Sequence, residues 1–129
     1  MEPPSDPLDD DLIRLDRALR GRDLRTARQH LATFGQRLTT YLRHEERTLF
    51  PLLEGHRPAP YLPTARMRRE HVMLRQLVVL LWDALGDHDR RRELELVSLL
   101  RSVLMLHRTK EAWVLQPLLP HASEHGERG

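Results

Sequence analysis

Residues 41–53 read YLRHEERTLFPLL, and residues 107–119, at an offset of 66, read HRTKEAWVLQPLL. Five positions are identical in the two strings: a glutamate, a leucine, a proline and the two leucines that follow the proline. The same offset relates two sets of apolar residues, which are Leu8, Leu12, Leu15 and Leu19 in the first half and Leu74, Val78, Leu81 and Leu85 in the second. The sequence therefore predicts an internal repeat, in which one pair of helices is a degenerate copy of another.

Four stretches of the chain carry apolar residues three and four positions apart, the spacing typical of one face of an α-helix. Prolines, glycines and capping aspartates predict helices from Pro7 to Gly21, from Asp23 to about Leu52, from Pro63 to Gly86, and from Asp87 or Asp89 to about Leu118. The apolar face of the second helix is Ala27, Leu31, Phe34, Leu38, Tyr41, Leu49 and Leu52. Pro51 is expected to kink or end that helix. We therefore predict an all-α, up-down-up-down four-helix bundle made of two helical hairpins.

The length of 129 residues is that of one domain. We expect residues 1–5 to be a disordered N-terminus, residues 6–119 to form the bundle, and residues 120–129 to be a flexible tail. No run of about 18 apolar residues predicts a membrane span. The acidic, proline-rich residues 1–11 are unlike a secretory signal, so a cytoplasmic location is expected.

The composition excludes several kinds of site. There is no cysteine, which rules out disulfides, iron–sulfur clusters, thiolate zinc sites and cysteine nucleophiles in this sequence. Twenty-one Lys and Arg against 19 Asp and Glu, with 5% aromatic residues, do not favour nucleic-acid binding. What stands out is eight histidines in a small domain without cysteine.

Two glutamates and two histidines fall on the apolar faces of the predicted helices. Glu45 follows Tyr41 by four residues, and Glu111 is the counterpart of Glu45 in the repeat. His107 precedes Glu111 by one turn, and His71 lies on the apolar face of the third helix. Inward carboxylates and imidazoles from several helices are how bundles hold metals, so the set predicts a metal site. Taken singly, each residue has an alternative: a core histidine bonded to a carbonyl, or a glutamate that reaches solvent.

These residues resemble the motif of the hemerythrin-like, or HHE cation-binding, domains. That motif has a histidine on helix one, His-x-x-x-Glu on helix two, a histidine on helix three and His-x-x-x-Glu on helix four. Residues 45–51 (EERTLFP), 107–117 (HRTKEAWVLQP) and 69–71 (REH) fit the strings of helices two, four and three. The resemblance spans roughly residues 6–119 and implies a non-haem di-iron centre that binds dioxygen, or acts in nitric oxide, peroxide or iron sensing and repair.

The chain departs from this motif at two positions. Tyr41 stands where the helix-two histidine is expected, and the position 66 residues before His71 is Ser5, so helix one supplies no imidazole. The intact half of the ligand set is therefore His71, His107 and Glu111, and the other half is reduced to Glu45 and Tyr41.

The reduced set leaves the number and identity of the metal open. Two histidines and one carboxylate are used by mononuclear non-haem Fe(II) and also by catalytic zinc. Glu45 either adds a fourth ligand or bridges to a second, weakly held metal. Tyr41 either ligates that metal or is a core aromatic whose hydroxyl bonds a polar neighbour. Mononuclear or dinuclear iron, zinc and manganese all remain candidates.

The residues and the resemblance together predict a non-haem iron-binding protein that binds or senses dioxygen, nitric oxide or peroxide, or that handles iron. No nucleophile–base pair or substrate motif indicates an enzyme beyond a redox-active metal. Two alternatives stay open. One is a zinc-binding variant of the same site, and the other is a metal-poor helical scaffold for a protein partner. The missing histidines favour the scaffold, and the inward glutamates oppose it.

Overall fold

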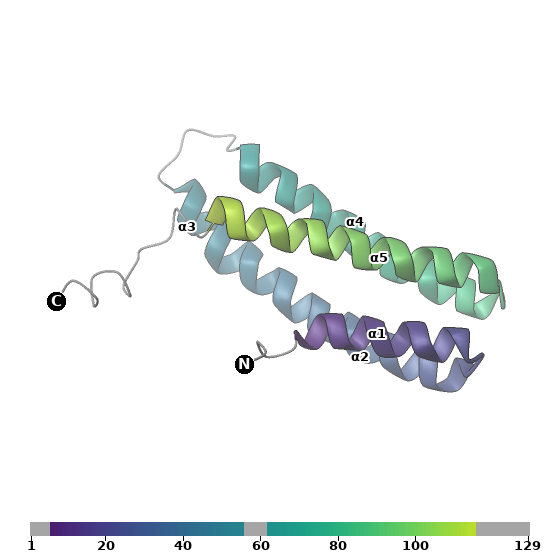
Figure 1. Cartoon of the computed structure of the whole chain (residues 1–129). Helices are drawn as coiled ribbons and strands as arrows, with labels where there is room; N and C mark the ends of the chain where they lie inside the picture. The colour runs from purple at the N-terminus through teal and green to yellow at the C-terminus, as the bar shows by residue number, and fades with distance from the viewer. Residues whose placement is uncertain (1–5, 56–61, 116–129) are drawn as a thin grey trace.

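The computed structural model describes residues 6–55 and 62–115. Within these ranges all regular structure is helical, and four long helices are arranged in a way consistent with a bundle (Figure 1). They are α1 (Pro7–Arg20), α2 (Leu24–His44), α4 (Leu62–Gly86) and α5 (Arg90–Lys110), and a short helix α3 (Phe50–Glu54) comes between α2 and α4. None of the described helices is long and apolar enough to cross a membrane. Residues 1–5 and 120–129, for which the sequence predicts disorder and flexibility, lie outside the described residues.

Aspartates begin three of the long helices. Asp6, Asp23 and Asp89 each accept a hydrogen bond from a backbone N–H two or three residues later, at 2.9–3.2 Å. Pro7 occupies the first position of α1, where its missing N–H is not needed. The predicted helix starts at these caps are confirmed, and Asp89, rather than Asp87, caps α5.

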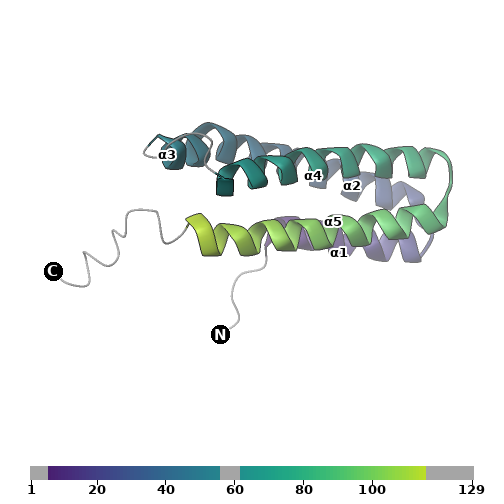
Figure 2. The same cartoon turned by 90° about the horizontal axis from the view of Figure 1, so that it is seen from above.

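The helices pack in two pairs that lie against each other. Besides the pairs α1–α2 and α4–α5, helix α2 contacts α4 and helix α1 contacts α5 (Figure 2). The space between them is filled mainly by fully buried apolar side chains, which include Leu12, Leu15, Leu31, Phe34, Leu74, Leu81, Leu85, Leu100 and Leu104. A second, smaller apolar cluster lies at the α3 end and contains Phe50, Leu53 and Met67. Along α4, His71 comes between Met67 of the small cluster and Leu74 of the large one, so the polar residues are enclosed by apolar packing.

Helix α2, predicted from Asp23 to about Leu52, is α-helical only as far as His44. Residues Glu45–Leu49 form a π-helical segment, η1, in which the N–H of Phe50 bonds the carbonyl of Glu45 five residues earlier. Pro51 has no N–H to give to the carbonyl four residues before it, which is a local reason for the changed pattern. The wider turn moves the buried face on by one residue. Phe50 and Leu53 are buried, whereas Leu52 is 50% exposed, so the predicted inward position of Leu52 is wrong.

Helix α5, the last of the four predicted helices, changes in the same way. Its α-helical part ends at Lys110, and Glu111–Leu115 forms a second π-helical segment, η2. The predicted helix to about Leu118 is therefore helical as far as Leu115, with a change to π-helical hydrogen bonding at Glu111 that the sequence analysis did not predict. Residues 116–119 lie outside the described residues. Both π-helical segments begin at a glutamate of the predicted site. Single π-helical turns inside helices are frequent at functional sites.

Candidate metal centre

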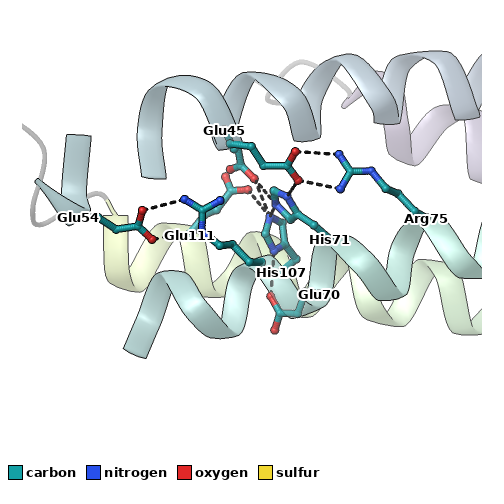
Figure 3. Close-up of polar contacts among 9 residues, drawn as sticks. Glu45, Glu54, Glu70, His71, Arg75, His107 and Glu111 are labelled. Atoms are coloured by element: carbon teal, nitrogen blue, oxygen red, sulfur yellow. Dashed lines mark hydrogen bonds and ion pairs between the residues drawn. The ribbon is translucent and has the colours of Figure 1, made fainter. Parts of the chain in front are cut away.

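Three buried side chains from three helical segments meet inside the bundle (Figure 3). Glu45 begins η1, His71 belongs to α4 and His107 belongs to α5. Glu45 Oε1 lies 2.9 Å from His71 Nε2 and 2.9 Å from His107 Nε2, and the two Nε2 atoms are 3.3 Å apart. No side chain of the three is more than 1% exposed. A group of possible metal ligands is thus shielded from water.

Glu111 joins this group from η2. Its Oε1 lies 3.0 Å from His107 Nε2, and its side chain is 23% exposed. Glu111 Oε1 and Glu45 Oε2 are both buried and have no hydrogen-bond partner within the described part of the chain. One N–H on His107 cannot serve the oxygens of two carboxylates and the nitrogen of His71 together. Several acceptor atoms thus converge on one N–H, and Glu45 Oε2 and Glu111 Oε1 have no donor in the described part of the chain. This arrangement favours binding of a cation.

The spacing of the ligand atoms of Glu45, His71 and His107 fits a metal ion. Ligand nitrogens and oxygens about 2.0–2.2 Å from a metal lie about 2.8–3.6 Å from one another in tetrahedral or octahedral arrangements. The three separations among Glu45 Oε1, His71 Nε2 and His107 Nε2, from 2.9 to 3.3 Å, fall in that range. The distance of 3.0 Å from Glu111 Oε1 to His107 Nε2 does so too. Two imidazoles and two carboxylates suit Fe(II), Zn(II) and Mn(II), so the residues present fit a divalent transition metal.

Each histidine is held from behind by a second carboxylate. His71 Nδ1–H donates to Glu46 Oε2 at 2.6 Å, and His107 Nδ1–H donates to Glu70 Oε1 at 2.9 Å. An acceptor at Nδ1 fixes the proton there and leaves Nε2 to bind a metal. The carboxylates thus orient both imidazoles toward the centre.

The two orienting carboxylates are themselves paired with cations. Arg75 donates two hydrogen bonds to Glu46, at 2.8 and 3.0 Å, and Lys110 forms an ion pair with Glu70. Hydrogen bonding to Arg75 outweighs the opposing effect of burial and, with His71, lowers the pKa of Glu46 to about 2. Glu46 is therefore a fixed negative charge behind His71.

Protonation inside the site follows from burial and hydrogen bonding. Burial acts to raise the pKa of Glu45, but hydrogen bonds from His107 and His71 outweigh it, and the pKa lies below its ordinary value. Burial acts to lower the pKa of His107, but hydrogen bonds to Glu45 and Glu70 outweigh it and raise the pKa. Burial raises the pKa of Glu111 to about 7. A metal that binds here must displace protons from His107 and, near neutral pH, from Glu111.

The structure brings together four of the five site residues that the sequence singles out. The fifth, Tyr41, lies beside the group. Its ring meets the ring of His107 edge-on at 6.1 Å, and its hydroxyl is buried without a hydrogen-bond partner in the described ranges.

Sequence reasoning missed the roles of Glu46 and Glu70. Each is the immediate neighbour of a predicted ligand, Glu46 after Glu45 and Glu70 before His71. Each nevertheless contacts a histidine of another helix, because adjacent residues on a helix point about 100° apart. The available signal was an acidic residue beside a ligand on the flank of the apolar face.

Comparison with known proteins gives one match. The family model of the hemerythrin HHE cation-binding domain matches residues 7–119. No curated protein and no solved structure matches the chain. The matched range contains all four convergent residues and both orienting carboxylates. On this evidence the chain belongs to the hemerythrin HHE cation-binding domain family.

Proposed function

We propose that this protein is a non-haem iron-binding protein whose iron is held by His71, His107, Glu111 and Glu45. The observation that carries the proposal is the convergence of Glu45 Oε1, His71 Nε2 and His107 Nε2, which lie 2.9–3.3 Å from one another, with each imidazole oriented by a carboxylate. Glu111 Oε1 joins them at 3.0 Å from His107 Nε2. Two histidines with carboxylates are the donors that non-haem iron proteins use. Bound iron would supply an electron-rich centre able to bind dioxygen, nitric oxide or peroxide.

The residues of the chain would prepare that centre. Glu46 and Glu70 keep Nδ1 of each imidazole protonated and raise the basicity of Nε2. The ring of Phe50 lies 5.0 Å from that of His71 and covers it from the α3 side, which keeps water away from the ligands. These features support binding of a small ligand in a dry site. A cytoplasmic location remains a prediction.

We further infer that the two halves of the chain form an up-down-up-down bundle with an internal repeat. Support comes from the offset of 66 residues, which relates η1 to η2, and Asp23, the cap of α2, to Asp89, the cap of α5. In this arrangement each half contributes one glutamate from the start of a π-helical segment.

Metal content per chain tests the proposal. The full chain, purified without chelator or metal-affinity tag, would be analysed by mass spectrometry for iron, zinc and manganese, beside a visible spectrum. We expect iron in the wild type and its loss in His107→Ala. His44→Ala is the matched control, because His44 is exposed and adjacent to Glu45 in sequence, so its iron content should be unchanged.

Two results would contradict the proposal. Zinc bound in preference to iron, after anaerobic loading with an equal mixture, would favour the zinc-binding alternative. No stoichiometric metal under any loading condition would favour the scaffold alternative, for which exposed apolar side chains such as Val79, Met105 and Leu106 offer contact surface.

A further inference from the structure

The first half of the chain lacks the two histidines of the family motif, and other residues occupy the positions where they would lie. The offset of 66 residues relates Tyr41 to His107 and Ser5 to His71. Asp6 follows Ser5 directly and begins the described part of the chain. Tyr41 and Asp6 therefore mark, on α2 and at the start of α1, the positions from which a second pair of imidazoles would come.

Arg108 contacts both of these residues. Its Nη1 forms an ion pair with Asp6 Oδ2, and its guanidinium carbon lies 5.3 Å from the centre of the Tyr41 ring. Tyr41 in turn meets His107, the residue that precedes Arg108, edge-on. The side chain of Arg108 is 32% exposed and that of Asp6 is 19% exposed. The Arg108 guanidinium is thus half-buried, and the ring of Tyr41 contacts both it and the candidate ligand His107.

The described residues form no second cluster of potential ligands on this side of the site. Within residues 6–55 and 62–115, the one group of three or more His, Cys, Asp or Glu side chains close enough to hold a metal is Glu45, His71 and His107. The space next to Tyr41 and Arg108 is a pocket of about 740 Å³, whose walls include Arg37 and Thr40. Its potential ligands are Asp6, which pairs with Arg108, and the exposed His44.

We propose that the chain holds a single metal ion. The Arg108 guanidinium, which pairs with Asp6 and contacts the face of Tyr41, provides the positive charge that a second metal ion would bring to the half of the site that lacks histidines. An arginine is charged at every physiological pH and has no lone pair to give to a metal. Its charge repels a divalent ion placed nearby, more strongly in a half-buried site than in water. Its contact with the face of Tyr41 is a cation–π interaction that keeps the ring engaged. This inference rests on the proposed metal site.

The experiment is a comparison of four full-length proteins. They are the wild type, Tyr41→His, Arg108→Leu and the double variant Tyr41→His/Arg108→Leu. Each is loaded anaerobically with Fe(II), and separately with Zn(II), and freed of excess metal by gel filtration. Metal per chain is then measured by mass spectrometry, with far-UV circular dichroism as the check on folding. Arg101→Leu, which removes an exposed arginine of the same helix, is the matched control.

We expect one metal per chain in the wild type, the control and both single variants, and about two in the double variant. The Tyr41→His variant adds an imidazole but keeps the guanidinium, so it separates the two effects. Two metals per chain in the wild type would overturn the single-metal inference. Two in Tyr41→His, or one in a folded double variant, would overturn the role of Arg108. No metal in any of the proteins would overturn the proposed function itself, and this inference with it.

Discussion

The carboxylate behind His71 offers a sharp test of how the site is built. Glu46 accepts two hydrogen bonds from Arg75 and one from His71 Nδ1. In Glu46→Gln the side chain keeps its size and an acceptor oxygen but loses its negative charge. We expect weaker metal binding, because a neutral acceptor makes the imidazole a poorer electron donor and holds it less firmly.

The pKa of Glu46 sets an upper limit on how much stability the Glu46→Gln variant loses. The pKa falls from an ordinary 4.5 to about 2, which corresponds to about 3 kcal/mol in favour of the charged form. Arg75 is the largest source and its side chain is 40% exposed, so solvent screening reduces the effect on stability to about 1 kcal/mol. For metal affinity we expect a loss of about 10–100-fold, or about 1.4–2.7 kcal/mol.

The assay is competition for Fe(II) or Zn(II) with a chromophoric chelator, under anaerobic conditions for iron. Glu54→Gln is the matched control, because Arg68 donates two hydrogen bonds to Glu54, at 2.8 and 3.2 Å (Figure 3). Among the described residues, no histidine bonds Glu54. That variant should lose some stability and keep its metal affinity. Equal metal affinities in Glu46→Gln and Glu54→Gln would refute the reasoning, because the histidine contact would then contribute nothing.

Four further outcomes follow from the structure. In the metal-free protein Glu111, with its pKa raised to about 7, and His107, with a raised pKa, hold more protons folded than unfolded. Through Glu111, stability in urea should therefore fall by up to about 3 kcal/mol as the pH rises from about 4.5 through 7, and through His107 it should fall further above about pH 6.5. Saturating metal should remove this loss. Burial raises the pKa of Glu93, which is 2% exposed, so Glu93→Met should raise the free energy of unfolding at pH 7 by about 1 kcal/mol and lessen its decline above about pH 4.5. Arg22 has φ 59°, a left-handed conformation that favours glycine, so Arg22→Gly should raise the melting temperature, by an amount equivalent to at most about 1 kcal/mol. Leu81 is fully buried, so Leu81→Ala should cost about 2–5 kcal/mol in urea denaturation.

The sequence was informative where one residue type has one common structural use. The caps Asp6, Asp23 and Asp89 mark helix starts, and the spacing of leucines predicts which faces are buried. Glu45, His71, His107 and Glu111 could also be predicted as site residues, because a charged residue on an apolar helical face needs a partner. These inferences depend only on local chemistry and helical period.

The π-helical segments could not be predicted in this way. A period of 3.6 residues places Leu49 and Leu52 inward, whereas the extra residue in η1 moves Phe50 and Leu53 there. Pro51 signals a change of hydrogen bonding but does not specify whether the helix bends, ends or widens. The cross-helix contacts of Glu46 and Glu70 depend on the rotation of α2, α4 and α5 about their axes, which packing sets.

The orienting contacts link the helices in a chain that ties the site to the fold. Glu46, in η1 directly after α2, holds His71 of α4, and Glu70, beside His71, holds His107 of α5. A shift of any of these helices therefore misplaces a ligand on the next. Without a metal, the bundle buries Glu45 and two imidazoles and leaves carboxylate oxygens unpaired, an arrangement that costs stability relative to apolar packing. A cation at the centre satisfies those oxygens and stabilises the packing of the three helices together, so metal binding and the stability of this end of the bundle should rise and fall as one.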